Sequence, residues 1–150
     1  MEIRNIKNND NYLKEYIILC NDEWGSKKNK EQLKKYIEEK MKQIHSGSKV
    51  ISILALIHDD KMLGFISLFK YDGEKRKDLT PWYATMYVKK EYRNRGYSKL
   101  LNDAILKEAK NLGYKKVYLK TTLNDYYEKF NAQYFDSLEK KEKIYYIELE

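Results

Sequence analysis

The chain has 150 residues and one cysteine, a length that suits one domain and a cysteine count that excludes an internal disulfide. Two histidines are too few for a zinc cluster of the usual kind, and no segment approaches the roughly 20 apolar residues of a membrane span. The formal net charge of +7 favours an anionic partner: nucleic acid, an acidic membrane surface or a phosphate-rich cofactor. The N-terminus lacks the apolar core of a signal peptide, so we expect a cytoplasmic protein.

Apolar periodicity, capping residues and turn residues predict seven strands and four helices in one mixed α/β (α+β) domain that covers residues 1–150. The expected strands are 1–7, 50–58, 62–71, 82–88, 116–121, 133–135 and 144–149. The expected helices are 12–21, 30–45, 96–111 and 124–130. No repeat, proline-rich linker or low-complexity segment divides the chain.

Capping residues define the ends of these helices. Asp10 or Asn11 is expected to cap the first helix, Asn29 the second and Asn124 the fourth. The third helix is expected to end at Gly113, since glycine is the usual stop. The predicted buried stripe of the third helix consists of Leu100, Leu101, Ala104, Ile105 and Leu112.

The strand 82–88, the helix 96–111 and the strand 116–121 form a β-α-β unit. A crossover through a helix joins parallel strands. The strands 50–58 and 62–71 instead form a hairpin, because only a tight turn separates them. We therefore expect a mixed sheet, with both parallel and antiparallel pairs.

The most informative stretch is the basic loop before the third helix. Backbone N–H groups at a helix start have no partner within the helix, and the helix dipole adds positive charge there, so such an end binds phosphate. Gly96 lets the main chain approach an anion, and Ser98 is small enough not to block it. Arg93 and Arg95 add full positive charges. As a bare pattern, Arg-x-x-Gly-x-Ser also fits a solvated basic loop.

This stretch resembles the GNAT superfamily of acetyl-CoA-dependent N-acetyltransferases, in which a strand ending in Val is followed five residues later by Arg-x-x-Gly-x-Gly or Ala. Val88, Arg93, Gly96 and Ser98 stand at those spacings, with serine in place of the usual Gly or Ala. Further matches are Leu112-Gly113, the strand 117–119, Asn124 and the segment Tyr127-Glu128-Lys129-Phe130. The resemblance is most specific over 78–131, and its first five residues are similar to an uncharacterised bacterial subgroup.

The resemblance implies a GNAT-like twisted mixed sheet of about seven strands, flanked by about four helices, that splays after the fourth strand. Acetyl-CoA would lie in this splay as the cosubstrate, and no metal is implied. The cofactor-binding residues that the resemblance implies are Met86, Tyr87, Val88, Arg93, Asn94, Arg95, Gly96, Tyr97, Ser98, Lys99 and Asn124.

The implied reaction is direct attack of a neutral amine on the thioester, with Tyr127 as the acid that protonates the leaving thiolate. Tyr126 is the neighbouring alternative. The base is open, because Trp82 stands where some family members carry a glutamate; water, Asp22 or Glu23 would take the proton instead. The residues assigned to the acceptor pocket are Glu23, Trp24 and Trp82, although both tryptophans also fit the core.

Three functions follow from these features. The first is acetyl transfer from acetyl-CoA to an amine of a small molecule or peptide. The second is a non-catalytic CoA-binding module of the same fold. The third, a basic nucleic-acid-binding protein, is weaker because no helix clusters its Lys and Arg residues and no aromatic-basic RNA signature is present. The identity of the acceptor and the formation of a homodimer stay open.

Overall fold

A computed structural model describes residues 1–47 and 49–150. Its strands are β1 (Glu2–Asn5), β2 (Val50–His58), β3 (Lys61–Phe69), β4 (Trp82–Val88), β5 (Lys116–Thr121), β6 (Gln133–Ser137) and β7 (Lys143–Glu148). Its helices are α1 (Asp10–Trp24), α2 (Lys30–Ser46) and α3 (Tyr97–Asn111), with short 3-10 turns at Lys90–Tyr92 and Tyr127–Phe130. The predicted mixed α/β fold is confirmed, with three α-helices in the described residues rather than about four.

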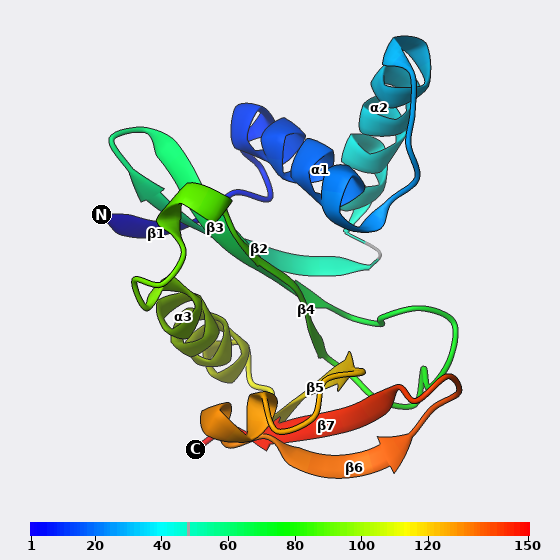
Figure 1. Ribbon diagram of the computed structural model, residues 1–150, viewed down its shortest axis with the longest axis vertical. Coiled ribbons are helices and arrows are strands. Elements are labelled where there is room, and N and C mark those ends of the chain that lie inside the picture. Colours follow the sequence, from blue (N-terminus) through cyan, green and yellow to red (C-terminus); the bar gives the residue numbers. More distant parts are fainter. Residues whose placement is uncertain (48) are drawn as a thin grey trace.

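One sheet of seven strands, in the order β1-β2-β3-β4-β5-β7-β6, forms the centre of the described structure. Helices α1 and α2 cover one face of the sheet, and α3 covers the other (Figure 1). Each face has its own core: Leu13, Ile17 and Ile37 pack on the first, and Leu101 and Ile105 on the second. The sheet is therefore the middle layer of three.

The caps of α1 and α2 explain where these helices begin. Asn29 caps α2 as predicted, and a capping box forms because the Gln32 side chain accepts from the Asn29 backbone N–H in return. The cap of α1 was expected at Asp10 or Asn11, but Asn9 holds it. Asn9 has extended backbone geometry, and its side chain accepts from the Tyr12 N–H at 3.3 Å.

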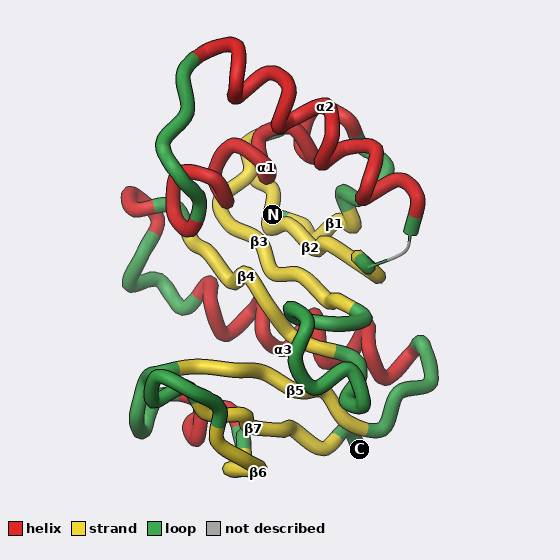
Figure 2. Tube along the Cα trace, turned by 90° about the vertical axis from the view of Figure 1, so that its right-hand side faces the viewer, coloured by secondary structure: helices red, strands yellow, loops and turns green. Residues whose placement is uncertain are grey.

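The sheet splays between β4 and β5. These strands are parallel, as predicted, but the ladder pairs them only at Trp82 and Tyr118. One further main-chain bond, from the Tyr118 N–H to the Pro81 carbonyl at 2.9 Å, lies beside that pair. Beyond it the two strands diverge (Figure 2). The opening between them is the place where the cavities of the site lie.

Strand β4 contains a bulge at the edge of this opening. Phe65 of β3 pairs with Tyr87 and Ser67 pairs with Ala84, so two residues of β4, Thr85 and Met86, fall opposite one residue of β3. Thr85 has a left-handed backbone with φ of +51°. Because side chains alternate along a strand, one extra residue exchanges the faces of everything that follows it.

Helix α3 buries a narrower stripe than the sequence predicts. Its buried residues are Leu101, Asn102, Ile105 and Ala109. Leu100 and Leu112 are 45% and 52% exposed, so these two assignments are wrong. Both leucines follow the helical spacing. The contact between α3 and the sheet, however, is already filled by Leu101, Ile105 and Ala109, which lie four residues apart on one side of the helix.

The segment 124–130 was predicted as a helix capped by Asn124, and this is also wrong. The chain forms only a 3-10 turn over Tyr127–Phe130, whose preceding residue makes no side-chain cap. Asn124 is exposed, and its side-chain oxygen accepts a hydrogen bond from the Lys143 ammonium group at 2.6 Å. Asn131, which follows this turn, adopts a left-handed conformation with φ of +67°.

Candidate active site

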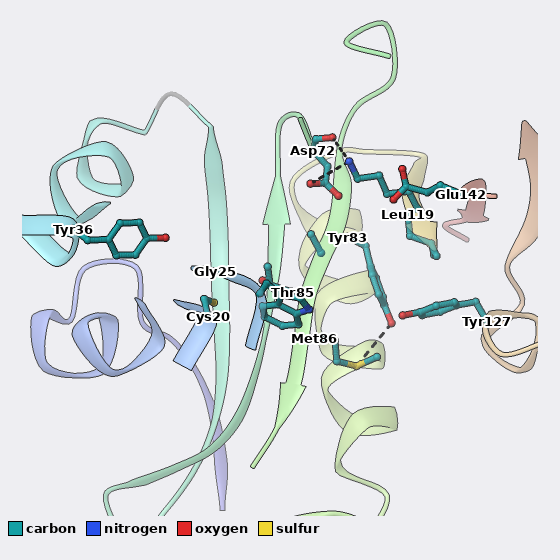
Figure 3. A pocket seen from close by; sticks show the side chains of 13 residues that line it. Cys20, Gly25, Tyr36, Asp72, Tyr83, Thr85, Met86, Leu119, Tyr127 and Glu142 are labelled. Atoms are coloured by element: carbon teal, nitrogen blue, oxygen red, sulfur yellow. Dashed lines mark hydrogen bonds and ion pairs between the residues drawn. The ribbon is translucent and has the colours of Figure 1, made fainter. Parts of the chain in front are cut away.

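Two cavities lie on either side of the β4 bulge. The first, which we call the loop groove, has a volume of about 720 Å³ and runs from β4 along the loop to the start of α3. The second, the inner cavity, has a volume of about 500 Å³ and lies toward β5 and α1 (Figure 3). Trp24, Met86 and Tyr127 line both, so the two cavities meet at these side chains.

The loop groove gathers most of the residues that the resemblance assigned to the cofactor. Of that set, its lining contains Met86, Tyr87, Val88, Arg93, Asn94, Gly96, Tyr97 and Ser98. It also contains seven residues that sequence reasoning did not assign to cofactor binding: Glu23, Trp24, Tyr92, Leu123, Tyr126, Tyr127 and Lys129. Tyr126 and Lys129 lie within the segment that resembles the family, with the Lys129 ammonium 4.0 Å from the centre of the Tyr126 ring.

Three predicted cofactor residues lie outside this lining. The guanidinium of Arg95 lies over the ring of Tyr92, 5.8 Å from its centre. The Lys99 ammonium pairs with the Asp103 carboxylate at 2.9 Å, one helical turn away. Asn124 is bonded to Lys143, as described above. The structure therefore brings the loop backbone and Arg93 to the groove, but turns these three side chains to other partners.

The start of α3 presents unpaired backbone N–H groups to the groove. Asn94 and Gly96 have left-handed backbones, with φ of +64° and +80°, and this geometry turns the chain sharply into the helix. The first helical hydrogen bond runs from the Leu100 N–H to the Gly96 carbonyl, and no side chain caps this end. A Cβ placed on Gly96 would meet no atom within 4 Å, so the space before the helix is open. This arrangement suits an anion.

Arg93 fixes the loop to the end of β4. Its Nε–H donates to the Val88 carbonyl at 2.8 Å, and its guanidinium lies 5.6 Å from the centre of the Tyr87 ring. The Nε–H side of the planar guanidinium is thereby used to orient the Arg93 side chain. A fork held in this way needs little further ordering to bind phosphate oxygens.

Tyr127 lies where the two cavities meet. Its ring stands edge to face against Tyr83, with centroids 6.2 Å apart, and the two hydroxyl groups point toward each other (Figure 3). The Tyr83 hydroxyl donates to the Asn102 side chain at 2.6 Å, whereas in the described residues the Tyr127 hydroxyl has no hydrogen-bond partner. Burial, and then the neighbouring Tyr126, raises the pKa of Tyr127 above its usual value. The phenol is therefore a neutral proton donor.

The inner cavity carries two carboxylates and one ammonium group on its wall. Asp72 and Glu142 supply the carboxylates and Lys120 the ammonium. The Lys120 ammonium donates to the Asp72 main-chain carbonyl at 3.0 Å and lies 4.0 Å from one of its carboxylate oxygens. Burial raises the pKa of Asp72; Lys120 and Lys49 oppose that shift, and Glu142 adds to it. A cation brought into this cavity would offset the cost of burying the carboxylates.

The tryptophans and acids assigned to the acceptor pocket fall in different places. Trp24 lines both cavities. Trp82 is 1% exposed and its indole N–H donates to the Leu79 carbonyl at 2.9 Å, so its assignment to the pocket is wrong and it belongs to the core. Glu23 lines the loop groove instead of the inner cavity, and Asp22 is exposed. Asp72 and Glu142, which tertiary folding brings to the same cavity wall, were assigned to no site from the sequence.

Cys20 also lines the inner cavity, but its thiol is poorly suited to act as a nucleophile. Burial raises its pKa to about 12, and the neutral thiol is the unreactive form. The described residues contain no group of three or more His, Cys, Asp or Glu side chains placed to hold a metal ion. None of the helices in the described ranges has the length and apolarity needed to cross a membrane.

A model of the acetyltransferase (GNAT) family matches residues 13–132. A search of curated proteins finds no match. Among solved structures, an aminoglycoside 6′-N-acetyltransferase in complex with coenzyme A is similar, with a TM-score of 0.74 and 16% identity over 100% of this chain and 98% of that one. The PaiA N-acetyltransferase of Thermoplasma acidophilum, in complex with coenzyme A, has a TM-score of 0.67 and 19% identity over 99% of each chain. An N-acetyltransferase from Staphylococcus aureus has a TM-score of 0.69 and 16% identity over 99% and 98%.

The structural likeness confirms the predicted GNAT-like sheet. At these identities it shows a shared fold and nothing about substrates. The family model is a separate finding, because it rests on the sequence and spans the loop groove, α3 and Tyr127. The chain therefore belongs to the acetyltransferase (GNAT) family.

Proposed function

We propose that this chain is one domain that transfers an acetyl group from acetyl-CoA to an amine of a small molecule. A single observation carries the proposal: the loop groove and the inner cavity meet at Met86 and Tyr127 in the splay of the sheet. Two ligands entering from opposite sides would touch there. A CoA-binding module without catalysis would need only the groove.

The loop groove fits coenzyme A on the chemistry of its lining. Open space before Gly96, unpaired N–H groups at the start of α3 and the held guanidinium of Arg93 suit a pyrophosphate. The backbone of Met86 to Val88 lines the groove beside the splay, where a pantetheine arm can bond as a strand would. Two structural neighbours were solved with coenzyme A, which supports this assignment.

Acetyl-CoA would supply the acetyl group as a thioester that an amine can attack directly. The Tyr127 hydroxyl, held neutral by burial, can give its proton to the departing sulfur. The attacking amine must lose a proton, since an alkylammonium ion has no lone pair. No carboxylate stands on β4 for this purpose, and Glu23 lies on the groove side, so water in the inner cavity is the base that we favour.

We further propose that the acceptor is cationic. Asp72 and Glu142 outnumber Lys120 on the wall of the inner cavity, and a buried carboxylate gains from a positive partner. A panel of amines assayed for release of the CoA thiol would test both acetyl transfer and this preference. If none of the amines supports turnover although CoA binds tightly, the result would instead support the non-catalytic module.

Changing Asp72→Asn is expected to raise KM for cationic amines about tenfold or more, because one charge-assisted contact is lost while the side chain keeps its shape. The affinity for acetyl-CoA should stay unchanged, since Asp72 does not line the groove. The matched control is Asp78→Asn, an exposed carboxylate of the same loop that pairs with Arg76. Equal KM values for wild type and Asp72→Asn would remove the cation site.

Changing Arg93→Ala together with Arg95→Ala is expected to weaken CoA binding by about tenfold to a hundredfold, measured by calorimetry. Each charge-assisted contact contributes roughly 1.5–3 kcal/mol, and of the two side chains only that of Arg93 lines the groove. The weakening should shrink in high salt, because part of it is screened. The control, Lys107→Ala with Lys110→Ala, removes the same charge from the exposed side of α3. Equal losses in both double variants would assign the effect to net charge alone.

A further inference from the structure

Three buried or half-buried hydroxyl groups meet beneath the β4 bulge, each from a different element. Tyr16 of α1 contacts Ser67 of β3 at 2.7 Å and Thr85 of β4 at 3.3 Å, measured between oxygens. Ser67 and Thr85 are also hydrogen-bonded to each other. Tyr16 is 5% exposed and Ser67 is fully buried, so the bond between these two hydroxyls is shielded from water. Burial raises the pKa of Tyr16, which keeps it a neutral hydroxyl able to donate and accept.

The bulge that these hydroxyls hold places a residue in a backbone conformation that its side chain disfavours. Thr85 has a φ of +51°, a region that β-branched residues rarely adopt. Glycine is the residue that a bulge usually places in a left-handed conformation. A threonine there keeps this geometry only when its surroundings enforce it. The Thr85 hydroxyl is hydrogen-bonded both to Tyr16 of α1 and to Ser67 of β3.

The bulge decides what the backbone presents to the two cavities. Met86 lines both cavities, yet neither Thr85 nor Met86 has a one-to-one partner in β3, and β5 pairs with β4 only at Trp82. The bulge also brings Tyr83 and Met86, three residues apart, to the same face, where the Tyr83 hydroxyl lies 3.9 Å from the Met86 sulfur. Toward β5 the main chain at Met86 has no ladder partner, so a ligand in the splay can reach it.

We propose that Tyr16 is a positioning residue for acetyl transfer: its hydroxyl, bonded to Ser67 and Thr85, holds the β4 bulge so that the main chain at Met86 faces the acetyl group of the bound thioester. This inference rests on the proposed function. It gives α1, which no cofactor assignment includes, a part in the reaction. It also predicts an effect on the acetyl end of the ligand and none on the pyrophosphate end.

The first test compares acetyl-CoA with CoA, which lacks the acetyl carbonyl. Tyr16→Phe keeps the ring that stands 4.7 Å from Phe65 and removes only the hydroxyl. Calorimetry is expected to show acetyl-CoA affinity reduced about tenfold and CoA affinity within about twofold of wild type. The matched control is Tyr12→Phe, which removes a hydroxyl from the same helix that bonds the distant Asp60 carbonyl at 2.8 Å. A parallel loss for both ligands would overturn the proposal, because general loosening of the fold would produce it.

A second test uses the strain at position 85. If Tyr16 acts by enforcing the left-handed bulge, a glycine there makes its hydroxyl dispensable, since glycine adopts positive φ without cost. In a Thr85→Gly background, Tyr16→Phe should change the ratio of the two affinities by less than about twofold. The mechanism would be overturned if Tyr16→Phe changed the ratio of acetyl-CoA to CoA affinity as much in this background as it does in the wild type. Thr85→Ser, which keeps the hydroxyl, should behave as wild type, and Thr85→Val should behave as Tyr16→Phe.

These outcomes separate the inference from the function on which it rests. Wild-type protein that binds neither CoA nor acetyl-CoA would remove the proposed function itself. Wild-type protein that binds both, with an unchanged ratio of affinities in Tyr16→Phe and Thr85→Val, would remove only the positioning role. Melting curves identify a Tyr16→Phe protein that does not fold, and the Thr85→Ser and Thr85→Val pair then decides the question alone.

Discussion

Replacing Tyr127 by phenylalanine is expected to lower turnover by about 10²–10⁴-fold, the usual contribution of a positioned general acid. Acetyl-CoA affinity should stay close to wild type, because the ring keeps its contacts with Tyr83 and Tyr126. Single-turnover kinetics and calorimetry on the same preparation measure the two effects separately. The change removes one hydroxyl that, in the described residues, has no hydrogen-bond partner to lose, so stability should barely change.

Tyr126→Phe is the control for this result. Tyr126 lines the loop groove but not the inner cavity, so its hydroxyl lies on the cofactor side only. A large loss at Tyr126 with none at Tyr127 would move the acid by one residue. Unchanged turnover in both variants would indicate that water or the substrate protonates the leaving thiolate.

The pH profile follows from the same group. As the proposed acid, Tyr127 would act in its protonated form, and burial raises its pKa above the ordinary value of a phenol, about 10. The acid is therefore fully present at neutral pH and is lost only as pH rises through that raised pKa. We expect no alkaline fall in turnover from this group below about pH 10, and an earlier fall that vanishes in Tyr127→Phe would contradict the assignment.

Gly96→Val is expected to reduce CoA affinity by about a hundredfold or more. A branched side chain would fill the open space before α3 and disfavour the φ of +80° that turns the loop. Both effects act on the N–H groups that we propose for pyrophosphate binding, so several charge-assisted bonds would be lost together. Calorimetry with CoA measures the loss, and a melting curve shows how much stability the backbone strain removes.

Gly113→Val is the matched control. Gly113 also has a left-handed backbone, with φ of +94°, and a Cβ there likewise meets nothing within 4 Å. It follows the opposite end of α3 and does not line the groove. Both variants should melt at a similarly lowered temperature, but only Gly96→Val should lose CoA. Comparable CoA loss in both would attribute the effect to destabilised α3.

The helix caps and strand ends were predictable where one residue or a short contiguous pattern determines them. Asn29 was identified as a cap because it is an asparagine directly before the helical periodicity of 30–45, and the structure confirms it and adds the capping box with Gln32. The cap of α1 was misplaced because Asn9 is followed by two more capping residues, and the sequence does not rank them. The strand β4 was predicted with correct ends, but its bulge was not, since threonine fits a regular strand as well.

The residues of the site were predictable only where they belong to one contiguous sequence motif. The loop from Arg93 to Ser98 is contiguous, so its spacing carries the information. Asp72 and Glu142 lie seventy residues apart, in the loops before β4 and before β7, and they meet only because both strands belong to one sheet. Trp82 was misassigned because its polar edge reaches a main-chain carbonyl three residues back, a contact that no pattern of residue types shows.

The single ladder pair between β4 and β5 also has a mechanical consequence. The strands β1 to β4 form one plate and β5, β7 and β6 form another, each held by long antiparallel ladders. The plates share one paired position and the bond from the Tyr118 N–H to the Pro81 carbonyl. A change in the angle between the plates would break no bond of either ladder, but it would have to move α3, which packs on β2, β3 and β4 of one plate and on β5 of the other.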